Sequence, residues 1–247
     1  MGLNQDITTK VKEILDTNFD VIDVTYVPEI TDTKLTFNNG GLKFEATTLF
    51  IDMRGSTKVL NNHNKSTIAK IHKAYLHTTV KIATSLDGQV RSFNGDSVLA
   101  FFQGTTKNSL SNAVKAAMQI SYMISSPDSG INNLLEKYSA VDFGIGLDHG
   151  KVLCTKVGIG GDNNTKDLIW IGNVINKSVV ISDECKSPNH IGISNYVYGN
   201  LNEEVKYHTR KNAFGMDEQV NMWTAYNVIY NGISETFYKT NYYWTVQ

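Results

Sequence analysis

Residues 50–57, FIDMRGST, decide the fold of this chain, because a strand ends there and a helix begins. An apolar run over residues 44–52 predicts the strand, and apolar residues at helical spacing over residues 57–85 predict the helix. Asp52 closes the strand, and a short polar turn follows it. We expect free backbone N–H groups in this turn, where a helix N-terminus can bind phosphate. The turn consists of Arg54, Gly55, Ser56 and Thr57.

Residues 94–102, NGDSVLAFF, supply a second acidic position. Asn94-Gly95 separates two alternating runs, and this dipeptide between such runs predicts a β-hairpin. Considered alone, Asp96 is interpreted as a turn residue and Asp52 as a helix cap. If the first strand and the hairpin are neighbours in one sheet, the two carboxylates lie at the same sheet edge. Two carboxylates beside an anion-binding turn predict a two-metal site for phosphoryl transfer.

The remaining pattern predicts an α+β fold of the ferredoxin-like, split βαβ type, with helices on one face of a mainly antiparallel sheet. After the first strand and helix the order is hairpin, helix, two strands, a glycine loop, a short strand, a helix and a last strand. We expect a turn at Asp148-His149-Gly150 between the two strands. The predicted elements beyond residue 85 are strands 88–93, 96–102, 139–147, 150–157, 168–171 and 190–193, helices 108–125 and 173–184, and the loop 158–167.

Three segments follow from this pattern. Residues 1–43 hold an amphipathic helix over residues 5–18 and an irregular linker. Residues 44–199 form the catalytic domain, and the aromatic-rich residues 200–247 form a strand-rich extension packed on the same domain.

Composition excludes several classes of protein. The chain has 247 residues, with 23 basic and 24 acidic side chains and a formal net charge of −1. This balance does not favour a nucleic-acid partner, which usually meets a basic excess. Two cysteines, the absence of a signal-peptide pattern and the absence of a long apolar run predict a cytoplasmic protein without a membrane partner.

Four motifs in order resemble the catalytic domain of class III nucleotide cyclases, over residues 44–193. They are FIDMRGST, NGDSVLAFF, GIGLDHGKVLCTKVGIGG (residues 144–161) and IWIGNVIN (residues 169–176). The resemblance implies that Asp52, the Met53 carbonyl and Asp96 hold two Mg²⁺ or Mn²⁺ ions per active site. It also implies that Asn176 positions the ribose of a nucleoside triphosphate.

The resemblance further implies a reaction and an assembly. The substrate's own 3′-hydroxyl is the nucleophile, so the enzyme needs no nucleophilic side chain, and pyrophosphate leaves. In this family one domain supplies the metal aspartates and a second supplies the base-reading positions and the asparagine. A chain with one such domain is therefore expected to act as a homodimer with two composite sites.

Two departures from the family pattern matter. The family's transition-state arginine falls at Val180, and neighbouring Lys177 reads as a solvated helix residue. The base-reading positions hold Ser92 and Ile169, which lack the charge of the purine readers.

Arg91 stands one residue before Ser92 and offers a longer donor. With Asn94-Gly95 as the two-residue turn, Arg91 pairs with Val98 and shares the face of Asp96, whereas a one-residue slip presents Ser92. Arginine suits the O2 and O4 acceptors of uracil, and suits cytosine slightly less well.

The segments VRSFNGDSVLAFF and LIWIGNVINKS also resemble the pyrimidine cyclases of bacterial anti-phage (Pycsar) signalling. That resemblance implies conversion of UTP to cUMP, with CTP as the alternative substrate, and a separate effector that senses the product without necessarily binding this protein. A purine cyclase and a catalytically weak nucleotide-binding regulator remain alternatives. A diguanylate cyclase is disfavoured, because NGDS stands where that family has its GGDEF-like hairpin.

Overall fold

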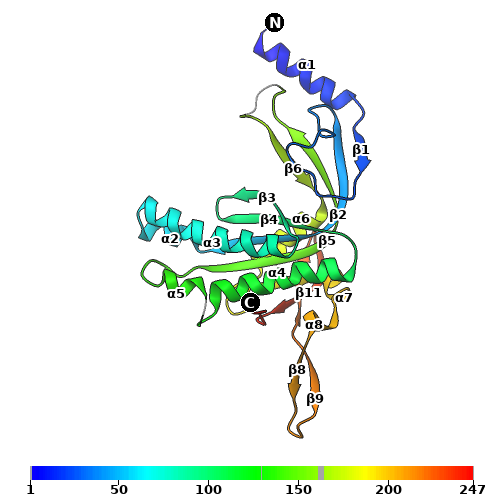
Figure 1. Cartoon of the computed structure of the whole chain (residues 1–247). Helices are drawn as coiled ribbons and strands as arrows, with labels where there is room; N and C mark the ends of the chain where they lie inside the picture. The colour runs from blue at the N-terminus through cyan, green and yellow to red at the C-terminus, as the bar shows by residue number, and fades with distance from the viewer. Residues whose placement is uncertain (1, 129, 161–163, 247) are drawn as a thin grey trace.

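The computed structural model describes residues 2–128, 130–160 and 164–246 (Figure 1). Residues 161–163 of the predicted glycine loop lie outside the described residues. The main sheet runs in the order β10-β11-β7-β5-β2-β4-β3, with β1 paired to β2 and β6 paired to β5. Most of its pairs are antiparallel, which confirms the predicted α+β class.

The strands are β1 (Asp20–Asp23), β2 (Gly40–Arg54), β3 (Gln89–Asn94), β4 (Ser97–Gln103), β5 (Asp142–Val157), β6 (Asp167–Ile171), β7 (Ile191–Ser194), β8 (Tyr207–Lys211), β9 (Asp217–Asn221), β10 (Thr224–Tyr230) and β11 (Ile233–Thr240). The helices are α1 (Leu3–Asp16), α2 (Ser56–Asn62), α3 (Lys65–Ser85), α4 (Lys107–Ser125), α5 (Ile131–Leu135), α6 (Asn173–Asp183), α7 (Asn195–Gly199) and α8 (Glu203–Lys206).

The long pair of β2 and β5 forms the spine of the molecule. β5 passes without a break through Asp148, His149 and Gly150, where we predicted a turn. These residues pair in register with Thr48, Thr47 and Ala46 of β2. Ladder hydrogen bonds on a long neighbouring strand therefore override the local preference for a turn.

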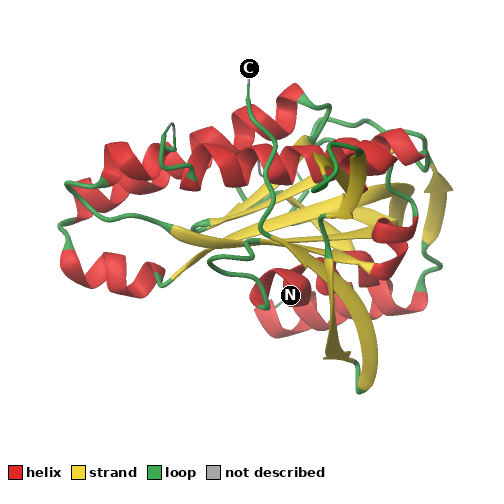
Figure 2. Ribbon diagram, turned by 90° about the horizontal axis from the view of Figure 1, so that it is seen from below, coloured by secondary structure: helices red, strands yellow, loops and turns green. Residues whose placement is uncertain are grey.

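A hydrophobic cluster covers each face of the sheet, and helices lie on both (Figure 2). α3 and α4 pack on the first face, whereas α6 packs on the second, which corrects the prediction of helices on one face. Gly144 and Gly146 of β5 make this approach possible. A Cβ atom at Gly146 would lie 2.0 Å from the Ser178 carbonyl oxygen of α6.

The predicted helix 57–85 is in fact two helices. α2 ends at Asn62, and α3 begins at Lys65 with Asn64 as its cap. The Asn64 side chain accepts a hydrogen bond from the Thr67 N–H at 2.9 Å. Such capping supplies a side-chain partner for an N–H group that the first turn of a helix leaves free, so it favours a new start over a continuous helix.

The β3–β4 hairpin differs from its prediction by one residue at the turn. Asn94 pairs with Ser97, so Gly95 and Asp96 are the turn residues. Gly95 takes φ +64°, which glycine adopts without the cost that a Cβ imposes. Phe93 therefore pairs with Val98, and Arg91 falls in an irregularity of register between Val90 and Ser92.

The two terminal segments are packed differently. Val27 and Leu35 of the predicted linker are buried in the second cluster, while α1 has no buried residue and extends away from the body (Figure 1). At the other end, β10 and β11 extend the main sheet, and the β8–β9 hairpin projects from it. Within the described ranges, no helix is both long and apolar enough to cross a membrane.

Candidate active site

The structure brings Asp52 and Asp96 to one sheet edge. Ile51 pairs with Val98, so Asp52 lies beside the turn that carries Asp96. Burial raises the pKa of Asp52, the Asp96 charge raises it further, and the Arg54 guanidinium opposes both effects. Like charges this close to each other create a site that favours a cation.

Asp96 provides the test of whether these residues fit a metal. Its Oδ2 atom is buried and has no hydrogen-bond partner among the described residues. A buried carboxylate oxygen without a partner is costly, and a cation relieves that cost. The described residues hold no group of three or more potential metal-binding side chains. Two carboxylates still suffice for Mg²⁺, which takes its remaining ligands from substrate phosphates and water.

The turn after β2 has the conformation expected of a phosphate-binding segment. Gly55 takes φ +67° and caps α2, and no side chain bonds to the start of this helix. Beside the turn lies a hollow of about 260 Å³, lined in part by Arg54, Gly55, Lys58 and Asn62. Lys58 is a positive residue that the sequence analysis did not single out. The N–H groups of Ser56 and Thr57 remain our candidates for contact with phosphate.

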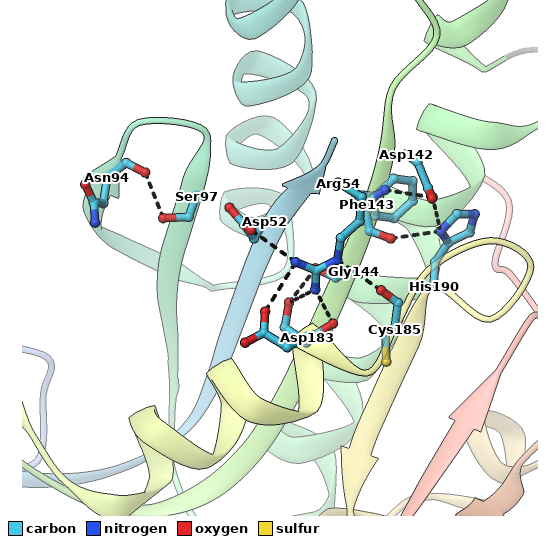
Figure 3. Close-up of polar contacts among 11 residues, drawn as sticks. Asp52, Arg54, Asn94, Ser97, Asp142, Phe143, Gly144, Asp183, Cys185 and His190 are labelled. Carbon is cyan, nitrogen blue, oxygen red and sulfur yellow. Dashed lines mark hydrogen bonds and ion pairs between the residues drawn. The ribbon is translucent and has the colours of Figure 1, made fainter. Parts of the chain in front are cut away.

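Arg54 points away from that turn, toward the end of α6 (Figure 3). Its Nη1 donates to Asp52 Oδ2 at 3.1 Å and to Asp183 Oδ1 at 3.3 Å. Its Nε donates to the Cys185 carbonyl at 3.1 Å, and its Nη2 donates to the Ser182 carbonyl and, at 3.1 Å, to the Ser182 hydroxyl. All five N–H groups of this guanidinium can thus be accounted for within the chain, which does not favour its predicted contact with phosphate.

Asn176 lies in the first half of α6 and is exposed. Asp183, at the other end of α6, is about 10 Å away along the helix axis at 1.5 Å per residue. Asn176 is therefore apart from Asp52 within one chain and is open to a partner. Lys177 pairs with Glu235 at 2.6 Å on another flank of α6, so it is not the free solvated residue we predicted. Val180 places no charge on α6 where the family has its arginine.

The base-reading positions are less well assembled. Arg91 is held by the N-terminal linker, since its Nε donates to the Pro28 carbonyl at 2.9 Å and its Nη2 to the Val27 carbonyl at 3.2 Å. Its Nη2 also lies 3.2 Å from Glu29 Oε1. Nη1 has one acceptor among the described residues, the Val90 carbonyl at 3.3 Å. Arg91 is thus fixed in place with one N–H group left to donate.

Ser92 and Ile169 face opposite sides of the sheet. Ser92 pairs with Leu99, which belongs to the second cluster, so Ser92 shares the face of that cluster. Leu168 and Trp170 of β6 pack on the same cluster, so Ile169 between them faces away. Ile169 is 42% exposed, and within this chain it does not meet Ser92.

Two buried aromatic residues were not among the predicted site residues, Tyr75 near Asp52 and Asp96, and Trp170 in the second cluster. The Trp170 indole nitrogen and the Tyr75 hydroxyl are buried and have no hydrogen-bond partner among the described residues. Burial raises the pKa of Tyr75 well above its usual value, and the charges of Asp52 and Asp96 add to this rise. Trp170 lies in the apolar run LIWI and Tyr75 lies at core spacing on the predicted helix 57–85, so both read as core residues in the sequence.

Comparison with known proteins gives a consistent result. The chain is 28% identical over 249 residues to a uridylate cyclase of Xanthomonas perforans, across the whole of both chains. It is 28% identical over 250 residues to a uridylate cyclase of Burkholderia cepacia, again across the whole of both. No protein-family model matches the chain.

Among solved structures, the guanylyl cyclase Cya2 superimposes with a TM-score of 0.65 at 17% identity, covering 82% of this chain and 94% of that one. The fold is therefore that of class III nucleotide cyclase catalytic domains.

Proposed function

We propose that this nucleotide cyclase converts UTP to 3′,5′-cyclic UMP and pyrophosphate, as a homodimer with two composite active sites. The observation that carries the proposal is the pair of carboxylates at one sheet edge, with Asp96 Oδ2 buried and lacking a partner among the described residues. The full-length relatives described as uridylate cyclases support the choice of substrate.

The reaction is an intramolecular displacement. The 3′-oxygen of UTP forms a bond to the α-phosphorus, the bond from that phosphorus to the β-bridging oxygen breaks, and the 3′-hydroxyl proton leaves to solvent. Asp52, Asp96 and the Met53 carbonyl would hold two Mg²⁺ or Mn²⁺ ions. Such ions acidify the 3′-hydroxyl and neutralise charge on the triphosphate when bound.

The chain's own residues bind and orient the substrate. The N–H groups of Ser56 and Thr57 donate to triphosphate oxygens, because no side chain in the described part of the chain caps the start of this helix. Asn176 of the second chain holds the ribose so that the 3′-oxygen lies in line with the leaving group. Lys58 is the candidate for the positive charge that Val180 does not supply.

Base selection rests on neutral and cationic donors. Arg91, fixed by the linker carbonyls, offers one N–H group to a carbonyl oxygen of uracil, and the Ser92 hydroxyl lies on the same strand. Arg91 is a donor only and cannot accept from the 4-amino group of cytosine. Arginine therefore favours UTP over CTP at this position.

One experiment tests the proposal. Purified protein is incubated separately with UTP, CTP, GTP and ATP plus Mn²⁺, and the products are identified by mass spectrometry. We expect cUMP as the main product and cCMP second. A purine cyclic nucleotide as the main product would refute the substrate assignment, and binding without turnover would identify a regulator.

We also propose a role in anti-phage defence, on the strength of the resemblance to Pycsar cyclases. The product would act on a separate effector that senses the cyclic nucleotide. In cells that carry the gene, phage infection should raise cUMP, and a strain with Asp96→Asn should show no rise.

A further inference from the structure

Arg54 connects two parts of the molecule that serve different chemical tasks. Its guanidinium is 21% exposed and bonds both to Asp52 and to the last residues of α6. α6 is also the helix that carries Asn176. One side chain therefore joins the strand end with the metal carboxylate to the helix with the ribose residue.

The fold provides a place for this connection. Asp52 pairs with Gly144 across the ladder. A Cβ atom at Gly144 would lie 2.4 Å from Arg54 Nη2 and 2.4 Å from the Ser182 carbonyl oxygen. Only glycine leaves room there for the guanidinium to reach the end of α6. The last carbonyls of a helix lack partners within the helix, and an arginine can donate hydrogen bonds to them. Its positive charge is also stabilised by the negative end of the helix dipole.

The alternative role, direct contact with the triphosphate, would require Arg54 to leave this arrangement. Leaving would strip the Ser182 and Cys185 carbonyls of a charged donor in a part-buried site. The Ser182 carbonyl would keep its bond from the Cys185 N–H, but the loss of the charged donor is destabilising in a part-buried site. The geometry therefore favours a residue that stays in place.

We propose that Arg54 is a positioning residue that couples the two active sites of the dimer. This inference rests on the proposed function, in which one chain gives Asp52 to one site and Asn176 to the other. Arg54 holds the Asp52 carboxylate toward the first site. Through the end of α6, it also fixes the position of Asn176 in the second site.

Mixed dimers separate these two tasks. An Asp52→Asn chain mixed with an Asn176→Ala chain forms dimers with one intact site, whose Asn176 comes from the first chain and whose Asp52 comes from the second. Arg54→Met is then added to the Asp52→Asn chain. In that chain Arg54 can affect the intact site only through α6.

We expect this addition to lower the activity of the mixture about tenfold through kcat, because small misplacements of a positioning group cost that much or more. Arg54→Lys keeps the positive charge with fewer donors and should lose less activity than Arg54→Met. It serves as a second variant in case Arg54→Met fails to fold. Arg210→Met, which removes an exposed ion pair on the projecting hairpin, is the matched control. Unchanged activity with Arg54→Met would overturn the coupling.

A second measurement does not depend on turnover. Mn²⁺ binding, followed by the spectrum of the free ion, should weaken about tenfold in the Arg54→Met homodimer, a loss typical when a residue that orients a metal ligand is removed. Unchanged Mn²⁺ binding would contradict the task assigned to Arg54 at Asp52. If the mixture without the Arg54 change regains no activity, the composite site itself is wrong and the coupling fails with it.

Discussion

The metal end and the base end of the candidate site differ in how completely one chain builds them. At the metal end, Asp52 and Asp96 meet through regular pairing of β2 and β4. At the base end, Arg91 lies at an irregularity of register, Ile169 faces away, and the linker covers the neighbouring cluster. The difference teaches that regular strand pairing positions the metal end, whereas a local irregularity of register and the linker position Arg91 at the base end.

The largest effect that we predict tests the metal end. Asp96→Asn removes a charge that no other described side chain replaces, and we expect activity to fall by about 10³-fold or more, as for loss of a principal electrostatic group. Product formation with UTP and Mn²⁺ measures the change, and circular dichroism checks the fold. Asp217→Asn, on the projecting hairpin, is the control, and activity retained in Asp96→Asn would show that the metal assignment is wrong.

The next effect concerns Asn176. Asn176→Ala leaves the metal carboxylates intact but removes the proposed hold on the ribose, and we expect kcat to fall by about 10²-fold. Mn²⁺ binding without nucleotide should not change. If Mn²⁺ binding falls as far as activity does, Asn176 acts at the metal end and does not hold the ribose.

A smaller effect tests the base end. Arg91→Met should lower kcat/KM for UTP by about tenfold to a hundredfold, the range expected when a buried donor to a substrate carbonyl is lost, and should reduce the preference for UTP over GTP. Glu29→Gln keeps the linker carbonyls and removes only an exposed partner of Arg91, so its preference should match the wild type. An unchanged preference in Arg91→Met would leave Arg91 as an anchor for the linker.

The smallest effect is a pH dependence of stability without metal. The pKa of Asp52 is raised in the folded chain by burial and by Asp96, so the folded state holds this proton more tightly than the unfolded state does. Stability should therefore fall as pH rises from the ordinary value of 3.8 toward the raised one.

Thermal unfolding of wild type and Asp96→Asn across this range measures the effect. Asp96→Asn should have a shallower dependence and, at neutral pH, a midpoint higher by about 2–4 °C if the repulsion is about 1 kcal/mol. A wild-type midpoint that is higher than that of Asp96→Asn at neutral pH would contradict the repulsion. Saturating Mn²⁺ should reverse the order, because only the wild type keeps both carboxylates.

The sequence by itself determined the fold class, the strand that ends near Asp52 and the hairpin beside Asp96, because each depends on local patterns and on pairing between regular strands. Only the tertiary structure decided that β5 runs unbroken, that Gly95 and Asp96 form the turn, and that Ile169 faces away. It also decided that the Arg54 guanidinium bonds to the end of α6. A long side chain next to a turn can reach several acceptors, and which acceptors lie within reach depends on where a distant helix packs.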